Sequence, residues 1–137
     1  MFDWGAFGEG AKWFLLAFGA AALVTVAFKI VYQIVTPYNE QKLIREGNLA
    51  AAITLGGALI GFAIALAKTI AQATSPAEFA AWAALAAIVQ ILVFVVVRTL
   101  VVRDLAARIE RGEVSTAVYL AAISIAAGLL NAASMTE

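Results

Sequence analysis

Three polar side chains inside long apolar stretches are the residues of this sequence best placed to do chemistry. Lys29 stands about two helical turns, or ~10 Å, inside the end of an apolar segment. A lysine at that depth could bind an anion or relay a proton, or its stem could carry the ammonium to the lipid headgroups. Gln90 and Asn131 lie inside two other apolar segments. Each could line a pore or contact a ligand, or could hydrogen-bond to a neighbouring helix, an interaction worth ~1 kcal/mol or less.

The composition excludes several common kinds of site. The chain has no cysteine, and therefore no disulfide or thiolate metal site, and no histidine, the commonest metal ligand and general base. Ser124 and Ser134 are isolated, and the apolar segments contain no paired nucleophile and base. We therefore expect no catalytic residue, no metal, no cofactor and no enzyme activity. The formal net charge of zero gives no bulk attraction to nucleic acid, which we do not expect as a partner.

Four apolar blocks position these residues. Hydrophobic residues make up 64% of the 137 residues and charged residues 13%, against about half and a quarter in soluble domains. Each block is near the ~20 residues that cross a bilayer core as a helix, and none shows the regular polar face of a soluble bundle. The sequence predicts an all-α fold, with residues 1–137 forming a single integral membrane bundle of four transmembrane helices. Their predicted ranges are about 13–35, 49–67, 79–97 and 114–135.

The ends of the first helix carry different signals. Residues 1–10 could lie along the membrane interface or be disordered. Tyr32 and Tyr38 are typical of anchors at the opposite interface. Thr36-Pro37 ends the helix, because proline disfavours a helical conformation at the residue before it.

The third helix could continue beyond the membrane. Val101, Leu105 and Ile109 repeat every four residues, which is typical of one helical face. Asp104 and Arg108 are spaced to pair on such a helix.

The second helix carries a face of small residues. Ala50, Thr54, Gly57, Gly61 and Ala65 share this face. Gly57 and Gly61 form a GxxxG pattern, which lets another helix approach closely. That helix could belong to the same chain or to another copy, and we expect a homo-oligomer.

Two stretches align at an offset of 65 residues. Ile44–Gly61 lies over Ile109–Ala126, and Gly47 matches Gly112. Each stretch joins two predicted helices through a turn that contains glycine. The chain could therefore consist of two parallel helix-hairpin repeats, related by an axis along the membrane normal.

Basic residues are distributed unevenly between the two sides of the predicted bundle. Six lie in the turns that follow the first and third helices, and the opposite side has only Lys12 and Lys68. This asymmetry predicts that those two turns are cytoplasmic and that both termini are periplasmic. The turns could be solvated loops, dock a protein partner or bind lipid headgroups. The residues of this candidate surface are Glu40, Arg45, Arg98, Arg103, Arg108 and Arg111.

Several of these features together resemble the YjfL-like family of small bacterial inner-membrane proteins, catalogued as a domain of unknown function. The resemblance covers nearly the whole chain after Val31. It implies four helices in a bacterial plasma membrane and supplies no catalytic residues. Relatives are encoded beside proteins similar to phage-shock membrane-remodelling factors and to glutathionylspermidine-synthase-like ligases, which implies a link to envelope stress. The matching features are Thr36-Pro37, Asn39-Glu40, Gly47-Asn48, Ala50-Ala51, Gly57, Gly61, Gln90, Arg98 and Asn131-Ala132-Ala133 with Met135.

Two hypotheses about function follow. The first is an interaction or structural subunit of the inner membrane, whose partners are the lipid bilayer, other copies of the chain and a cytoplasmic or membrane protein. The alternative is a small oligomeric ion channel or transporter. Thr25, Lys29, Tyr32 and Thr36 share one helical face and, with Gln90, could provide its polar lining.

Overall fold

The computed structural model of the protein describes residues 1–135, which form helices and no strands. Four of the helices are long and apolar enough to cross a membrane, so the predicted all-α class and four apolar spans are confirmed. Residues 136 and 137 of the predicted domain lie outside the described residues. The four long helices are α1 (Trp4–Val35), α3 (Leu49–Gln72), α4 (Pro76–Val96) and α6 (Val114–Ser134), and the shorter elements are α2 (Glu40–Arg45), the π-helical turn η1 (Val97–Val101) and α5 (Leu105–Glu110).

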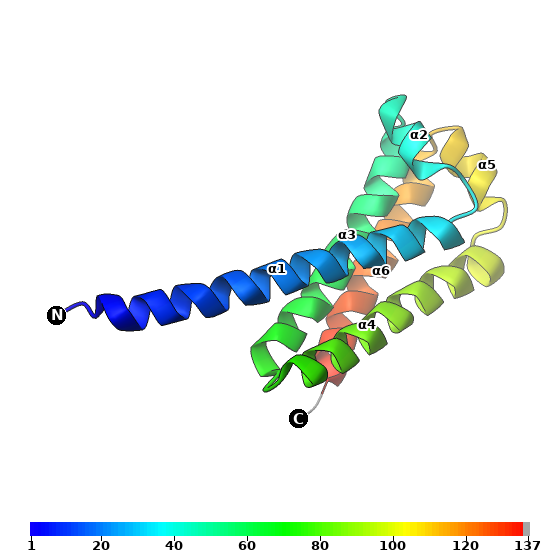
Figure 1. Cartoon of the computed structure of the whole chain (residues 1–137). Helices are drawn as coiled ribbons and strands as arrows, with labels where there is room; N and C mark the ends of the chain where they lie inside the picture. Colours follow the sequence, from blue (N-terminus) through cyan, green and yellow to red (C-terminus); the bar gives the residue numbers. More distant parts are fainter. Residues whose placement is uncertain (136–137) are drawn as a thin grey trace.

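The long helices α3 and α6 form the centre of the bundle, where they run side by side in the same direction (Figure 1). Both α1 and α4 run the opposite way and pack against α3. The short helices α2 and α5 lie together at one end of the bundle, here called the α2–α5 end. The turn between α3 and α4 and the end of α6 lie at the other end.

Helix α1 begins earlier than its predicted start at residue 13. The Asp3 carboxylate accepts hydrogen bonds from the backbone N–H groups of Gly5 and Ala6, at 3.0 and 3.1 Å, and so caps the helix. Residues 4–10 are therefore helical rather than disordered. Only Phe28 and Tyr32 of α1 are buried, and its first half extends away from the other helices (Figure 1).

Helix α3 ends at Gln72, beyond its predicted end at residue 67, and α4 begins at Pro76, before its predicted start at residue 79. The Ser75 hydroxyl accepts a hydrogen bond from the backbone N–H of Glu78 at 3.1 Å, and Pro76 occupies the first turn of α4. Proline fits that position because the first N–H groups of a helix have no intrahelical partner.

The predicted continuation of the third helix is wrong. The chain leaves η1 at Val102, which is extended, and Asp104 is left-handed with φ of 60°. This turn places Asp104 outside α5, so its carboxylate is not on the helical face of Arg108. Arg108 instead donates to the Glu113 carboxylate at 3.0 Å.

The turns that precede α3 and α6 share one backbone geometry at an offset of 65 residues. Gly47 and Gly112 are both left-handed, with φ of 85° and 77°. That the complete hairpins are parallel repeats stays a prediction. Three backbone hydrogen bonds of the first turn recur in the second. In the first turn they join Glu46 N to Lys42 O at 3.0 Å, Gly47 N to Ile44 O at 3.0 Å and Asn48 N to Leu43 O at 2.8 Å. In the second turn they join Arg111 N to Ala107 O at 3.0 Å, Gly112 N to Ile109 O at 2.9 Å and Glu113 N to Arg108 O at 3.0 Å.

Candidate functional site

Glycines bring α3 and α6 into direct backbone contact. A Cβ atom on Gly57 would lie 2.5 Å from Cα of Ala121. A Cβ atom on Gly61 would overlap the carbonyl oxygen of Ser124, and one on Gly128 would overlap the carbonyl oxygen of Gly61. The GxxxG face of the second predicted helix therefore packs within the chain. Sequence reasoning missed Gly128, although the small pair Ser124 and Gly128, four residues apart, was a signal for it.

Gln90 and Asn131 join α4 to α6 by reciprocal hydrogen bonds. The amide Nε2 of Gln90 donates to the carbonyl oxygen of Ser124 on α6, at 3.3 Å. The amide Nδ2 of Asn131 donates to the carbonyl oxygen of Ala86 on α4, at 3.1 Å. These contacts place both amides between two helices of the same chain.

Lys29 lies on α1 and reaches toward α2. Its ammonium donates to Oε1 of Gln41 at 3.5 Å, and Nε2 of Gln33 donates to the same oxygen at 3.2 Å. The hydroxyls of Thr25 and Thr36 bond to carbonyls of α1 itself. Lys29 thus does not meet Gln90 or Asn131, and the three predicted polar residues line no common path in one chain.

Three arginines of the candidate surface take part in specific contacts at the α2–α5 end. Nη1 of Arg98 donates to the carbonyl oxygen of Val35 at 2.8 Å. This bond satisfies a carbonyl at the end of α1, where a positive charge is favourable. Arg108 and Arg111 lie 3.0 and 3.6 Å from the carboxylate of Glu113. Hydrogen bonds from Thr116 and Arg108 hold the pKa of Glu113 below its usual range.

Arg45 and Arg103 are exposed at the same end. Beneath them, Asn48 joins the two short-helix turns. Its side-chain oxygen accepts from the backbone N–H of Ala51 at 2.9 Å, which caps α3, and its Nδ2 donates to the carbonyl oxygen of Ile109 at 2.8 Å. One side chain thus satisfies the start of α3 and the end of α5.

Glu40 differs from the prediction because it is inside the protein and not on the candidate surface. Only 2% of the residue is exposed, and Tyr32 and Tyr38 beside it are 1% and 6% exposed. We call these three residues the Glu40 cluster. Both carboxylate oxygens and both tyrosine hydroxyls have no hydrogen-bond partner within residues 1–135. The tyrosines are therefore buried, and not interfacial anchors as their positions predicted.

The surroundings of the Glu40 cluster are apolar on one side and charged on the other. The ring of Tyr32 packs against Phe94 of α4, with centroids 4.8 Å apart. Burial raises the pKa of Glu40 to about 7, while the ammonium of Lys29 and the hydroxyl of Tyr38 act in the opposite direction. A carboxyl group in this environment exchanges its proton near neutral pH.

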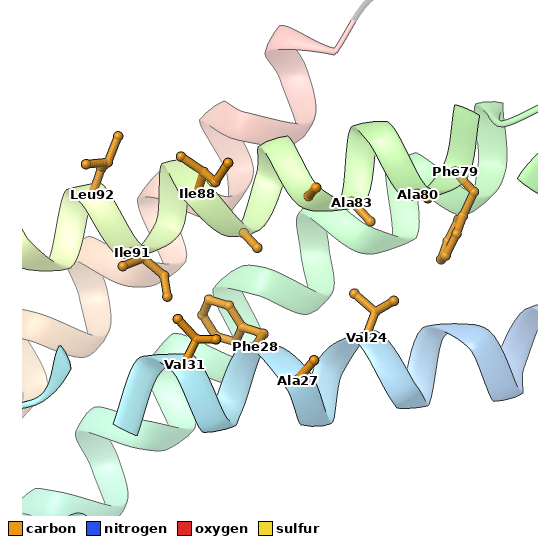
Figure 2. A pocket seen from close by; sticks show the side chains of 12 residues that line it. Val24, Ala27, Phe28, Val31, Phe79, Ala80, Ala83, Ile88, Ile91 and Leu92 are labelled. Carbon is orange, nitrogen blue, oxygen red and sulfur yellow. The ribbon is translucent and has the colours of Figure 1, made fainter. Parts of the chain in front are cut away.

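An apolar groove lies between α1 and α4 (Figure 2). It has a volume of about 520 Å³, and every residue that lines it is apolar. Val24 and Phe28 lie on the α1 side, and Phe79, Ala83 and Ile88 lie on the α4 side. The groove can accept a hydrocarbon chain or another helix, and offers no polar group to a polar ligand.

Comparison with known proteins shows which family these features belong to. Residues 5–135 match the family described as "Domain of Unknown Function (DUF350)". The chain belongs to this family. It is similar to the UPF0719 inner membrane protein YjfL of Escherichia coli strain K12, with 35% identity over 126 residues, or 89% of this chain and 95% of that protein. The resemblance predicted from the sequence is confirmed.

A second relative comes from a different bacterium. The UPF0719 transmembrane protein YshE of Bacillus subtilis strain 168 is 34% identical over 65 residues, which are 47% of this chain and 48% of that protein. No solved structure matches the chain. The names of the relatives and the four apolar helices support a transmembrane protein of the inner membrane, and these names state no activity.

Proposed function

We propose that this chain is a structural subunit of the bacterial inner membrane, which associates with copies of itself and with a protein partner and catalyses no reaction. The first half of α1 is the observation that carries this proposal. No residue from Trp4 to Gly19 is buried, and this first half of the helix stands apart from the bundle (Figure 1). The surface of α1 is thus available to a neighbouring protein.

The length of α1 supports the same proposal. A helix of 32 residues spans ~48 Å at 1.5 Å per residue, whereas the hydrocarbon core is ~30 Å thick. Such a helix tilts or extends past the core. A tilted helix that leaves its own bundle can cross a neighbour, and the apolar groove between α1 and α4 continues this surface. Alanines at positions 83, 84 and 87 line the groove and permit close approach of a second helix.

Self-association through α1 can be tested by disulfide cross-linking, because the chain has no native cysteine. Cysteine would replace each residue from Leu15 to Phe18 in turn, and oxidation would be carried out in native membranes. A specific contact uses one face of the helix, so we expect dimer at one or two of these four positions. The matched control is Leu129→Cys, at an exposed position on α6. Equal yields at every position including the control, or none at all, would contradict the proposal.

We also propose that the α2–α5 end is cytoplasmic and that both termini are periplasmic. The excess of lysine and arginine at this end supports the orientation, since cytoplasmic loops carry more of both. Cysteine at exposed Arg45 should resist a membrane-impermeant maleimide in intact cells, and cysteine at exposed Phe2 should react. The reverse pattern would contradict this orientation.

The partner protein and the link to envelope stress rest on the family resemblance. The mass and composition of the complex, extracted gently from its native membrane, test both forms of association. A stoichiometric foreign subunit would support an accessory role. A pure homo-oligomer would oppose a stable partner and support self-association alone.

The alternative function is a small oligomeric ion channel or transporter. The geometry supports it less, because Gln90 bonds to α6 while Lys29 reaches toward Gln41. Copies of the chain would have to bring Lys29 to a shared path. Ion flux into liposomes that is unaltered by Lys29→Ala and Gln90→Leu would count against this alternative.

A further inference from the structure

The Glu40 cluster has no part in the proposed assembly. Four buried oxygen atoms of Tyr32, Tyr38 and Glu40 have no hydrogen-bond partner in the described part of the chain. Unpaired polar groups lose their hydration on burial, and an ionised carboxylate loses the most. Glu40 therefore requires a proton or a counter-charge at this position.

The equivalent position in the second turn shows that the fold does not need this carboxyl group. Glu40 is the first residue of α2, and Leu105, at the offset of 65, is the first residue of α5. Both residues are buried, with 2% and 3% exposed. The backbone bonds that follow are the same in the two turns. An apolar side chain thus fits this geometry, and the turn does not require a carboxyl group at its first position.

We propose that Glu40 is a proton-binding site, in which the ammonium of Lys29 replaces the proton when the carboxyl group ionises. With the proton bound, the neutral carboxyl group is compatible with burial beside the tyrosines. On ionisation, the O–H bond breaks, its electron pair stays on the carboxylate and the proton passes to water. Lys29 then supplies the counter-charge.

The contacts of Lys29 allow this exchange. Its ammonium lies 3.5 Å from Oε1 of Gln41, at the long limit of a hydrogen bond. Nε2 of Gln33 donates to the same oxygen at 3.2 Å, so Gln41 keeps a donor when Lys29 leaves. Gln41 follows Glu40 directly in α2. Lys29 can therefore leave Gln41, and its charge already acts on the carboxyl group of Glu40.

The groups around Glu40 favour a proton over a metal cation. Lys29 and Tyr32 of α1 are near Glu40, and so is Tyr38 of the loop before α2. On α3, the neighbouring group is the hydroxyl of Thr54, which does not titrate. Burial raises the pKa of Tyr38, so its hydroxyl stays neutral. The ammonium of Lys29 would repel a metal cation, whereas it can pair with the carboxylate once the proton has left.

Infrared difference spectroscopy tests the proposal on the full chain in detergent, and it does not depend on self-association. The wild-type minus Glu40→Gln spectrum should contain a protonated carboxyl band that disappears with a midpoint near pH 7. Glu40→Gln imitates the neutral carboxyl group and should fold. The matched control is Glu46→Gln, at an exposed position in the same turn. The protein with this substitution should still show the protonated carboxyl band of Glu40.

Lys29→Met tests the role of Lys29 as the counter-charge, because it removes the ammonium and keeps the carboxyl group of Glu40. Loss of the ammonium should raise the midpoint, because the positive charge favours the ionised carboxylate. A wild-type midpoint near the ordinary glutamate value of about 4.3 would overturn the proposal. A midpoint that Lys29→Met leaves unmoved would overturn the role of Lys29.

Discussion

The turn before α3 and the turn before α6 reach the same backbone geometry with different side chains. Both begin with a buried residue, Glu40 in one and Leu105 in the other. Both contain a left-handed glycine, and both end with the same backbone hydrogen bonds. The glycines and the backbone bonds are thus sufficient for the turn. The turn forms with either a carboxyl or an apolar side chain at its first position, so this side chain is not needed to form the turn.

The two turns also place their charges differently. In the second turn, Glu113 stays near the surface and pairs with Arg108 and Arg111. In the first turn, Glu40 is buried without a hydrogen-bond partner among the residues described. Exposed ion pairs of the first kind contribute little to stability. A buried carboxyl group of the second kind makes the turn sensitive to its protonation state.

Exchanging the two buried residues should give the largest effect. Leu105→Glu should destabilise the protein by about 3 kcal/mol at pH 8, because it buries a charge without a prepared partner. Glu40→Leu should change stability by about 1 kcal/mol or less, or should stabilise the protein, because an apolar side chain fits the equivalent position and Lys29 keeps its contact with Gln41. Thermal unfolding of the chain in detergent measures both. Equal losses for the two variants would show that the turns are not comparable at this position.

Removing the glycines tests the shared backbone. Gly47→Ala and Gly112→Ala should each destabilise the protein by about 1–2 kcal/mol, because alanine is disfavoured in the left-handed conformation. A Cβ atom would meet nothing within 4 Å at either site, so the effect is conformational. Gly56→Ala is the control, since Gly56 is helical and its surroundings are equally open. Unequal losses at Gly47 and Gly112, measured by thermal unfolding, would break the comparison.

Much of this fold could be predicted from the order of the residues. Long apolar runs indicate the four spans because burial in a membrane needs a fixed length of apolar helix. Gly47 and Gly112 indicate the turns, and Asn48 is a good N-cap by type and position. These features depend on residues close together in the chain, so they can be predicted from short stretches of sequence.

The features that depend on tertiary contacts could not be predicted in this way. Glu40 stands in a charged segment that is typical of a solvated loop, and it is buried because α2 packs against α3. Its burial brings it within electrostatic range of Lys29, for which the sequence offered no acidic partner. The break at Val97–Val101 contains neither glycine nor proline, so no local signal marks it.

Asn48→Ala should have a smaller effect than the glycine variants, of about 1 kcal/mol, because the N-cap of α3 is lost. The variant also leaves the carbonyl oxygen of Ile109 without its donor, so the contact between the two turns weakens. Glu113→Ala, at the equivalent position, should change unfolding less, since Glu113 makes no side-chain cap hydrogen bond to α6. An equal or larger loss for Glu113→Ala in thermal unfolding would contradict this account.

The last expected effect is a difference in the sign of the pH dependence between Glu40 and Glu113. The pKa of Glu40 is raised by burial, so its contribution to stability is complete below about pH 4.3 and is lost as pH rises to about 7. The pKa of Glu113 is lowered by its hydrogen bonds, so its contribution is present above the unfolded value and is lost as pH falls. Unfolding temperatures between pH 3 and pH 8 should therefore fall less on the alkaline side in Glu40→Gln, and less on the acidic side in Glu113→Gln. The same pH profile for both variants would show that the two carboxyl groups do not differ in environment, and that the buried position of Glu40 has no chemical consequence.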